Sequence, residues 1–170
     1  PYVTHLAAVA WLVADYTKNE DCVIAAWLHD TLEDTDYTAE ELEEDFGREV
    51  RRIVETVTEP KEKNGEKLPW KERKLAYLEQ LKAGPDEALL IAAADKIHNM
   101  RSIVEEYYDN HQGFIKDFAG SLDERAMRYQ ELSNLLNRRL QSDIIAEFNH
   151  VYSEYKNFLA HVAKSVNKQK

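Results

Sequence analysis

Residues 22–35 have the sequence CVIAAWLHDTLEDT, an apolar run that ends abruptly in histidine and acidic residues. The run Cys22–Leu28 is apolar on every side, so the sequence predicts a buried helix there. A second run, LLIAAADKI at residues 89–97, is interrupted by Asp95. Burying an unpaired carboxylate costs on the order of several kcal/mol, so Asp95 needs a partner in the core. The two runs predict a helical bundle with ionisable groups inside it.

The rest of the chain also has helical periodicity. Only 5 of the 170 residues are glycine and 4 are proline, which favours long helices with few turns. A capping box at Thr38–Glu41 predicts a helix start, and a similar pattern occurs at Ser121–Glu124. Pro60, Gly65 and Pro69 indicate a loop at residues 58–69, and no strand pattern is visible. We therefore expect an all-α fold with helices near residues 5–16, 22–28, 38–46, 48–57, 70–82, 86–107, 121–140 and 144–159.

Composition bounds the class of protein. A chain of this length suits one domain, here residues 1–170, and we expect Trp11 and Trp27 in its core. The net charge of −10 argues against a broad nucleic-acid surface, although a small phosphorylated substrate stays compatible with it. No apolar run is long enough to span a bilayer, and no signal peptide is visible. The single cysteine, Cys22, fits a cytoplasmic location.

Four residues form a candidate metal site. His29 and Asp30 end the first apolar run, Asp95 interrupts the second, and His5 lies near the start of the first helix. Two imidazoles and two carboxylates suit Mn, Fe or Zn, and helices of a bundle can bring them to one point. The alternative to a metal ligand is that Asp95 pairs with a neighbouring cation or with a helix N-terminus and has a purely structural role.

Glu33 and Asp34 are candidate catalytic residues, because they follow Asp30 by three and four positions. A carboxylate beside a metal site can take a proton from water or give one to a leaving oxygen. The alternative is simple solvation, since residues 30–49 contain ten acidic side chains.

Together these segments resemble a known family. His5, the stretch HDTLEDT at residues 29–35 and the stretch ADKIHNMR at residues 94–101 are similar to the HD domain. More narrowly, they resemble the hydrolase domain of the RelA/SpoT family and the stand-alone metazoan SpoT homologues, which remove the 3′-diphosphate from (p)ppGpp. The resemblance covers about residues 1–107 and implies an HD-domain helical bundle, with additional C-terminal helices at about residues 108–170.

The resemblance also implies roles for individual residues. His5, His29, Asp30 and Asp95 match the ligands of a single divalent metal, most often Mn²⁺ in this family, with Fe or Zn as alternatives. Glu33 and Asp34 match the catalytic pair of the family. The resemblance further implies that Asn99, Ser102 and Lys61 contact the substrate. Residues 35–94 contain no histidine, which favours one metal over two, and His98 is expected to support the site rather than bind metal.

Two alternatives stay open at this stage. The substrate could be another nucleotide, such as a nucleoside monophosphate or NADPH, because Ala92 stands where the (p)ppGpp hydrolases often have a lysine. The chain could also be a catalytically silent module that binds a nucleotide. Residues 108–170 are expected either to pack over the core or to form the contact of a homo-oligomer.

Overall fold

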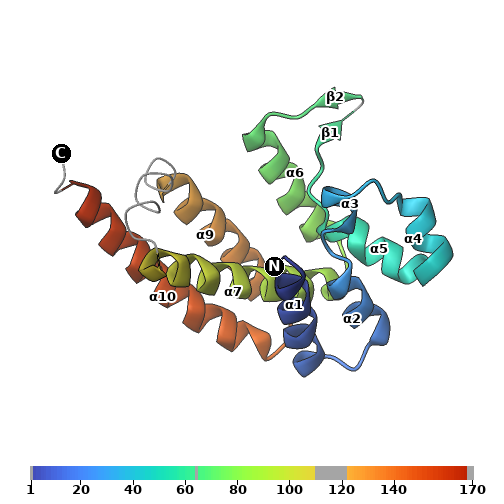
Figure 1. The fold of residues 1–170 in the computed structure, drawn as a ribbon, viewed down its shortest axis with the longest axis horizontal. Coiled ribbons are helices and arrows are strands. Elements are labelled where there is room, and N and C mark those ends of the chain that lie inside the picture. Colours follow the sequence, from blue (N-terminus) through green and yellow to red (C-terminus); the bar gives the residue numbers. More distant parts are fainter. Residues whose placement is uncertain (1, 64, 110–121, 168–170) are drawn as a thin grey trace.

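The computed structural model describes residues 2–63, 65–109 and 122–167, and it is an all-α fold, as predicted (Figure 1). Nine helices run along this part of the chain in the following order: α1 (Val3–Tyr16), α2 (Glu20–Trp27), α3 (Thr31–Asp34), α4 (Ala39–Phe46), α5 (Arg48–Val57), α6 (Trp70–Ala83), α7 (Asp86–Asp109), α9 (Leu122–Arg139) and α10 (Ile144–Asn167). None of these helices is both long enough and apolar enough to cross a membrane.

Helix α7 is the centre of the bundle. Helices α1, α2, α5, α9 and α10 all pack against it, and Figure 1 shows it running through the middle of the molecule. Every residue from Ala88 to Asp95 is buried. Each buried aliphatic side chain stabilises the fold by roughly 1.5–3 kcal/mol. A carboxylate in the middle of this helix is therefore held at a fixed place in the core.

Local sequence signals set the helix boundaries near the site. The predicted capping box of α4 is confirmed: the Thr38 hydroxyl accepts the Glu41 N–H at 3.2 Å, and the Glu41 carboxylate accepts the Thr38 N–H at 2.8 Å. Helix α2 is capped by Asn19, whose side-chain oxygen accepts the Cys22 N–H. At Gly47 the backbone has a φ of +91°, which permits α5 to start directly after α4.

The C-terminal part of the described chain enlarges the core. Helix α10 packs along α7, and α9 packs against α6, α7 and α10. Their buried side chains include Leu136, Ile144, Phe148 and Tyr155. Of the two expectations for this region, packing over the core is observed. The predicted capping box begins at Ser121, which lies outside the described residues.

The segment predicted to be only a loop contains a small hairpin. Strand β1 (Glu62–Lys63) pairs antiparallel with β2 (Glu66–Lys67), and Gly65 has a φ of +81° in the turn. The expectation of no strands was wrong here, because two-residue strands of charged side chains carry no alternation of apolar and polar residues.

Two tryptophans predicted to lie in the core are on the surface. Trp11 is 76% exposed and Trp27 is 44% exposed. The side chains that α1 and α2 bury are smaller, among them Ala10, Ala25 and Ala26. Small residues let the two helices pack closely, so the bulky indoles project outward. An apolar run on all sides of a helix does not reveal which side is buried.

Candidate metal centre and substrate cavity

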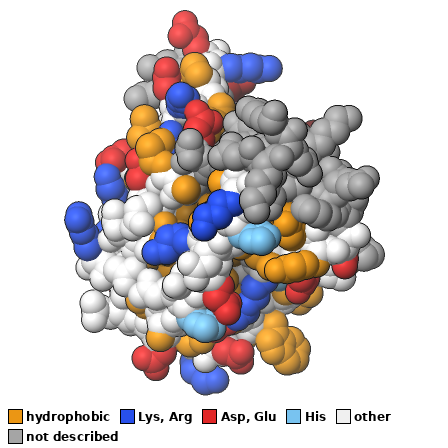
Figure 2. Space-filling view, turned by 90° about the vertical axis from the view of Figure 1, so that its left-hand side faces the viewer, with side chains coloured by type: hydrophobic (Ala, Val, Ile, Leu, Met, Phe, Trp, Pro, Cys, Tyr) orange, Lys and Arg blue, Asp and Glu red, His pale blue; other side chains and the backbone are white. Residues whose placement is uncertain are grey.

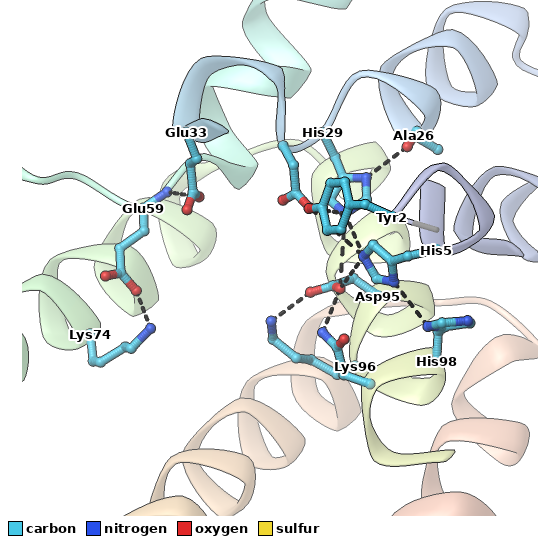
Figure 3. A network of polar contacts seen from close by, with 12 residues as sticks. Tyr2, His5, Ala26, His29, Glu33, Glu59, Lys74, Asp95, Lys96 and His98 are labelled. Atoms are coloured by element: carbon cyan, nitrogen blue, oxygen red, sulfur yellow. Dashed lines mark hydrogen bonds and ion pairs between the residues drawn. The ribbon is translucent and has the colours of Figure 1, made fainter. Parts of the chain in front are cut away.

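The four predicted ligands come from three separate elements and meet at one place. His5 projects from α1, Asp95 from the middle of α7, and His29 and Asp30 lie in the turn between α2 and α3. Figure 3 shows the side chains of His5, His29 and Asp95 pointing toward one another. All four side chains are largely withdrawn from solvent.

The distances place nitrogen and oxygen atoms within reach of a common ion. His5 Nε2 lies 3.2 Å from His29 Nε2 and 3.3 Å from Asp95 Oδ1. His29 Nε2 lies 3.3 Å from Asp30 Oδ2 and 3.9 Å from Asp95 Oδ1. The potential ligand atoms of His5, His29 and Asp30 all lie within 4.8 Å of one another. Asp95 is not part of this three-residue group, but its Oδ1 lies near both imidazoles. With Asp95 the donors would be two nitrogens and two oxygens, a set that fits a divalent transition metal.

Hydrogen bonds on the outer nitrogens orient both imidazoles. His29 Nδ1 donates to the Ala26 carbonyl at 2.8 Å, which leaves the lone pair of Nε2 pointing into the cluster. His5 Nδ1 and His98 Nδ1 are 2.9 Å apart, so one of the two donates to the other. Burial first, and then the neighbouring His5, lower the pKa of His98, so a neutral His98 can accept this hydrogen bond. His98 thus supports His5, in agreement with the supporting role expected from the sequence.

Asp95 is held by two neighbours on its own helix. Lys96 Nζ is 2.5 Å from Asp95 Oδ2, and Asn99 Nδ2 donates to Oδ1 at 2.6 Å. Burial opposes ionisation of this carboxyl, but the Lys96 charge, the hydrogen bond from His5 and the neighbouring His29 together outweigh it, and the pKa of Asp95 lies well below its usual range. The expected alternative, a carboxylate paired with a cation, is therefore present beside the cluster. Lys96 engages Oδ2, whereas Oδ1 accepts from Asn99 and also faces the two imidazoles.

Tyr2 adds a partner that the sequence analysis did not assign. Its hydroxyl donates to Asp30 Oδ2, and Figure 3 shows its ring lying over the cluster. Burial first, and then this carboxylate, raise the pKa of the Tyr2 hydroxyl, so it stays a proton donor. The hydrogen bond fixes the rotamer of Asp30 toward the imidazoles.

Glu33 is positioned at the edge of the cluster by the backbone of the next segment. Its Oε1 accepts the Glu59 N–H at 2.6 Å. Burial raises the pKa of the Glu33 carboxyl, and this exceeds the opposing effect of the Glu59 N–H. A carboxyl with a raised pKa beside a cluster of this kind is suited to taking up and giving back a proton.

Asp34 and Lys61, which were predicted to act beside Glu33, do not line the same cavity as Glu33. Asp34 is exposed and does not line the cavity described below, and Lys61 donates from Nζ to the Glu33 carbonyl. Glu59, which no sequence pattern indicated, is largely buried and is held by Lys74 and by Arg73 at 3.5 Å. The two α6 cations therefore fix the backbone that positions Glu33.

The cluster opens into a large cavity. It has a volume of about 830 Å³ and is lined by the four metal-site residues, Glu33, Asn99 and Ser102. One wall is formed by α9, through Glu124, Arg125, Arg128, Tyr129, Glu131 and Leu132, and another by α6, through Trp70, Lys74, Tyr77 and Leu78. The C-terminal part of the chain thus belongs to the site. From the sequence it was expected only to pack over the core or to form an oligomer contact. A cavity of this size suits a nucleotide.

Figure 2 shows one face of the molecule, on which Lys and Arg side chains lie interspersed with Asp and Glu. Basic residues on this face do not form one broad area.

Comparison with known proteins gives a family match and close relatives. A model of the HD domain matches residues 1–118. The human guanosine-3′,5′-bis(diphosphate) 3′-pyrophosphohydrolase MESH1 is 36% identical over 135 residues, which are 71% of this chain and 73% of that protein.

Two solved structures share the fold. A metazoan ortholog of SpoT, described as hydrolyzing ppGpp, superposes with a TM-score of 0.70 at 25% identity over 91% of this chain and 81% of its own. The protein lmo0812 from Listeria monocytogenes EGD-e superposes with a TM-score of 0.71 at 27% identity over 96% and 98% of the two chains. The shared fold therefore extends beyond the residues that the family model matches.

Proposed function

The chain belongs to the HD-domain family, and from this premise we propose that it is a metal-dependent phosphohydrolase that removes the 3′-diphosphate of (p)ppGpp. The observation that carries the proposal is that His5, His29, Asp30 and Asp95 lie close together in the lining of a nucleotide-sized cavity that Glu33 also lines. The relatives named as ppGpp hydrolases support the choice of substrate.

The same four residues are proposed to hold one divalent cation, with Mn²⁺ as the first candidate and Fe or Zn as alternatives. Two imidazole nitrogens and two carboxylate oxygens form a mixed donor set that suits these ions better than Ca²⁺ or Mg²⁺. When bound, such a cation makes water a stronger acid and offsets negative charge on phosphoryl oxygens.

Glu33 is proposed to take the proton of the attacking water. Its Oε1 is held by the Glu59 N–H, and its carboxylate lines the cavity next to Asp30. Asp34 is assigned a part in the same proton transfers, because its carboxylate is close enough to the Tyr2 hydroxyl to affect the pKa of that group. In the ionised state Glu33 is a base, and after the transfer it is the acid that can return the proton.

The proposed step balances as follows. The water oxygen forms a bond to the proximal phosphorus of the 3′-diphosphate, and its proton moves to Glu33. The bond between that phosphorus and the ribose 3′-oxygen breaks, and the 3′-oxygen takes a proton. The products are pyrophosphate and the 5′-nucleotide.

Asn99, Ser102 and Lys61 are proposed to contact the substrate. Asn99 and Ser102 line the cavity on α7, one turn apart. Lys61 approaches from the segment before the hairpin, next to the Glu33 backbone. We further propose that residues 1–170 act as one domain, since α9 and α10 share a core with α7, and that it works in the cytoplasm, where its one cysteine stays free.

A substrate panel tests the proposal. Metal-free protein is reloaded with Mn²⁺ and assayed against ppGpp, NADPH and nucleoside monophosphates, with Asp95→Ala and Glu33→Ala alongside. Metal-dependent release of pyrophosphate from ppGpp that is lost in both variants is the expected result. Turnover of another nucleotide alone would retain the chemistry and remove (p)ppGpp as the substrate, and binding without any turnover would replace the enzyme by a silent nucleotide-binding module.

A further inference from the structure

We propose that Arg128, held in place by Trp70 and Glu131, binds the phosphate group at the 5′ end of the nucleotide, the end that is not hydrolysed. The inference rests on the proposed function, because it assigns a second subsite in the same cavity. Arg128 projects from α9 and Trp70 begins α6, so the subsite lies where these two walls face each other.

The position of the Arg128 guanidinium is fixed by two contacts. Its Cζ lies 5.7 Å from the centroid of the Trp70 ring, which is a cation–π arrangement. Its Nη1 donates to Glu131 Oε2 at 2.9 Å, one helical turn along α9. With both contacts in place, the side chain is 18% exposed and lines the cavity. The guanidinium is therefore preorganised rather than extended into solvent.

One donor of this guanidinium is left without a partner. Arg128 Nε is buried and makes no hydrogen bond within the described part of the chain. A buried donor without an acceptor costs about 1–3 kcal/mol. Through the rest of its guanidinium, Arg128 brings a positive charge to the cavity wall, where a phosphate oxygen can accept a charge-assisted hydrogen bond. This feature points to an anionic group rather than to a neutral one.

The arrangement around Trp70 argues against stacking of a nucleobase on this ring. The indole already has Arg128 over it and Lys74 Nζ at 5.9 Å from its centroid. A base would have to displace one of these cations. Trp70 thus acts as a positioning residue for Arg128.

The chemistry of the substrate requires such a subsite. A nucleotide with a diphosphate on the 3′-oxygen and another on the 5′-oxygen carries anionic groups at two separate places. The metal-site end of the cavity serves the group that is cleaved. The other group needs a cation away from the Asp30 and Asp95 carboxylates, and Arg128 supplies one from the α9 wall.

The test compares two substrates that differ only at the 5′ end: ppGpp and guanosine 3′-diphosphate. For Arg128→Gln, we expect the KM for ppGpp to rise about 10- to 100-fold, as for loss of a charge-assisted hydrogen bond, while the KM for guanosine 3′-diphosphate stays unchanged. Trp70→Leu should show the same selectivity with an increase of about threefold, and no further effect in the Arg128→Gln background. Arg138→Gln, an exposed arginine on the same helix, is the matched control.

A binding measurement separates this inference from the proposed function. Calorimetric titration of GDP, which has the 5′-diphosphate and no scissile group, needs no turnover. We expect Arg128→Gln to weaken GDP binding by about the same factor as it raises the KM for ppGpp. Failure of the wild-type protein to cleave ppGpp would remove the proposed function. Equal KM shifts for both substrates, or unchanged GDP affinity in a protein that cleaves ppGpp, would overturn the subsite.

Discussion

Replacing Glu33 by Gln separates proton transfer from the architecture of the site. Glutamine keeps an oxygen where Oε1 accepts the Glu59 N–H at 2.6 Å, so the side chain keeps its position. It has no basic oxygen for the proton of water. A positioned general base contributes about 10²- to 10⁴-fold to the rate, and we expect kcat for ppGpp hydrolysis to fall by that factor. Steady-state release of pyrophosphate measures it.

The same substitution, which should lower kcat, is not expected to lower the stability of the folded protein. Burial raises the pKa of Glu33 in the folded protein above its unfolded value, so folding binds this proton more tightly. The stabilisation is complete below the unfolded pKa, about 4.3, and is lost as the pH rises through the folded pKa. Above the folded pKa the ionised carboxyl therefore lowers the free energy of unfolding, and there Glu33→Gln should be at least as stable as the wild type in urea.

The pH profile completes the test. In the wild type, kcat/KM should fall as the pH decreases through the raised pKa of Glu33, because the base becomes protonated. The residual rate of Glu33→Gln should lack this acidic limb. Glu44→Gln, an exposed carboxyl in the same acidic region, serves as the control with unchanged rate. A Glu33→Gln rate within threefold of wild type, or a loss of rate explained by unfolding, would refute the reasoning.

Three further substitutions probe the metal centre, the packing and the surface. His98→Phe should weaken Mn²⁺ binding about 10- to 100-fold by calorimetry, because it removes the partner 2.9 Å from His5 Nδ1, and unchanged affinity would show that His5 needs no such support. Gly84→Ala should destabilise the protein by about 1–3 kcal/mol in urea, because its Cβ would lie 2.4 Å from Thr56 Cγ2. Thr56→Ser in the same chain should restore most of this loss, and a lack of restoration would place the strain elsewhere. Trp11→Gln should change the free energy of unfolding by less than about 0.5 kcal/mol, because the indole is 76% exposed, whereas a larger loss would indicate a buried role.

The helices and the polar cluster could be predicted because their signals are local. The buried run at residues 89–97 has a carboxylate that needs a partner, and the run at residues 22–28 ends in His29 and Asp30. The capping box at Thr38 gives a helix start from four residues alone. Such patterns survive in any tertiary arrangement, so the sequence alone indicates them.

The walls of the cavity depend on how the helices pack, and the sequence does not encode that in a local pattern. Arg128 is one of several charged residues on α9, and nothing in its neighbours distinguishes it from the exposed Arg138. Glu59 lies in a loop among other charges, yet it is the acid that the α6 cations Arg73 and Lys74 bind. The contact of Trp70 with Arg128 on α9 likewise follows only from the fold.

Titration of the metal-free protein with Mn²⁺ tests the central claim most directly. The rate of pyrophosphate release from ppGpp is measured against equivalents of metal added, for the wild type and for Asp95→Asn. We predict that the rate rises from zero and reaches its maximum at one equivalent in the wild type, and that Asp95→Asn shows no comparable rise. Release of pyrophosphate without metal, or a maximum only at two equivalents, would contradict a single ion held by His5, His29, Asp30 and Asp95.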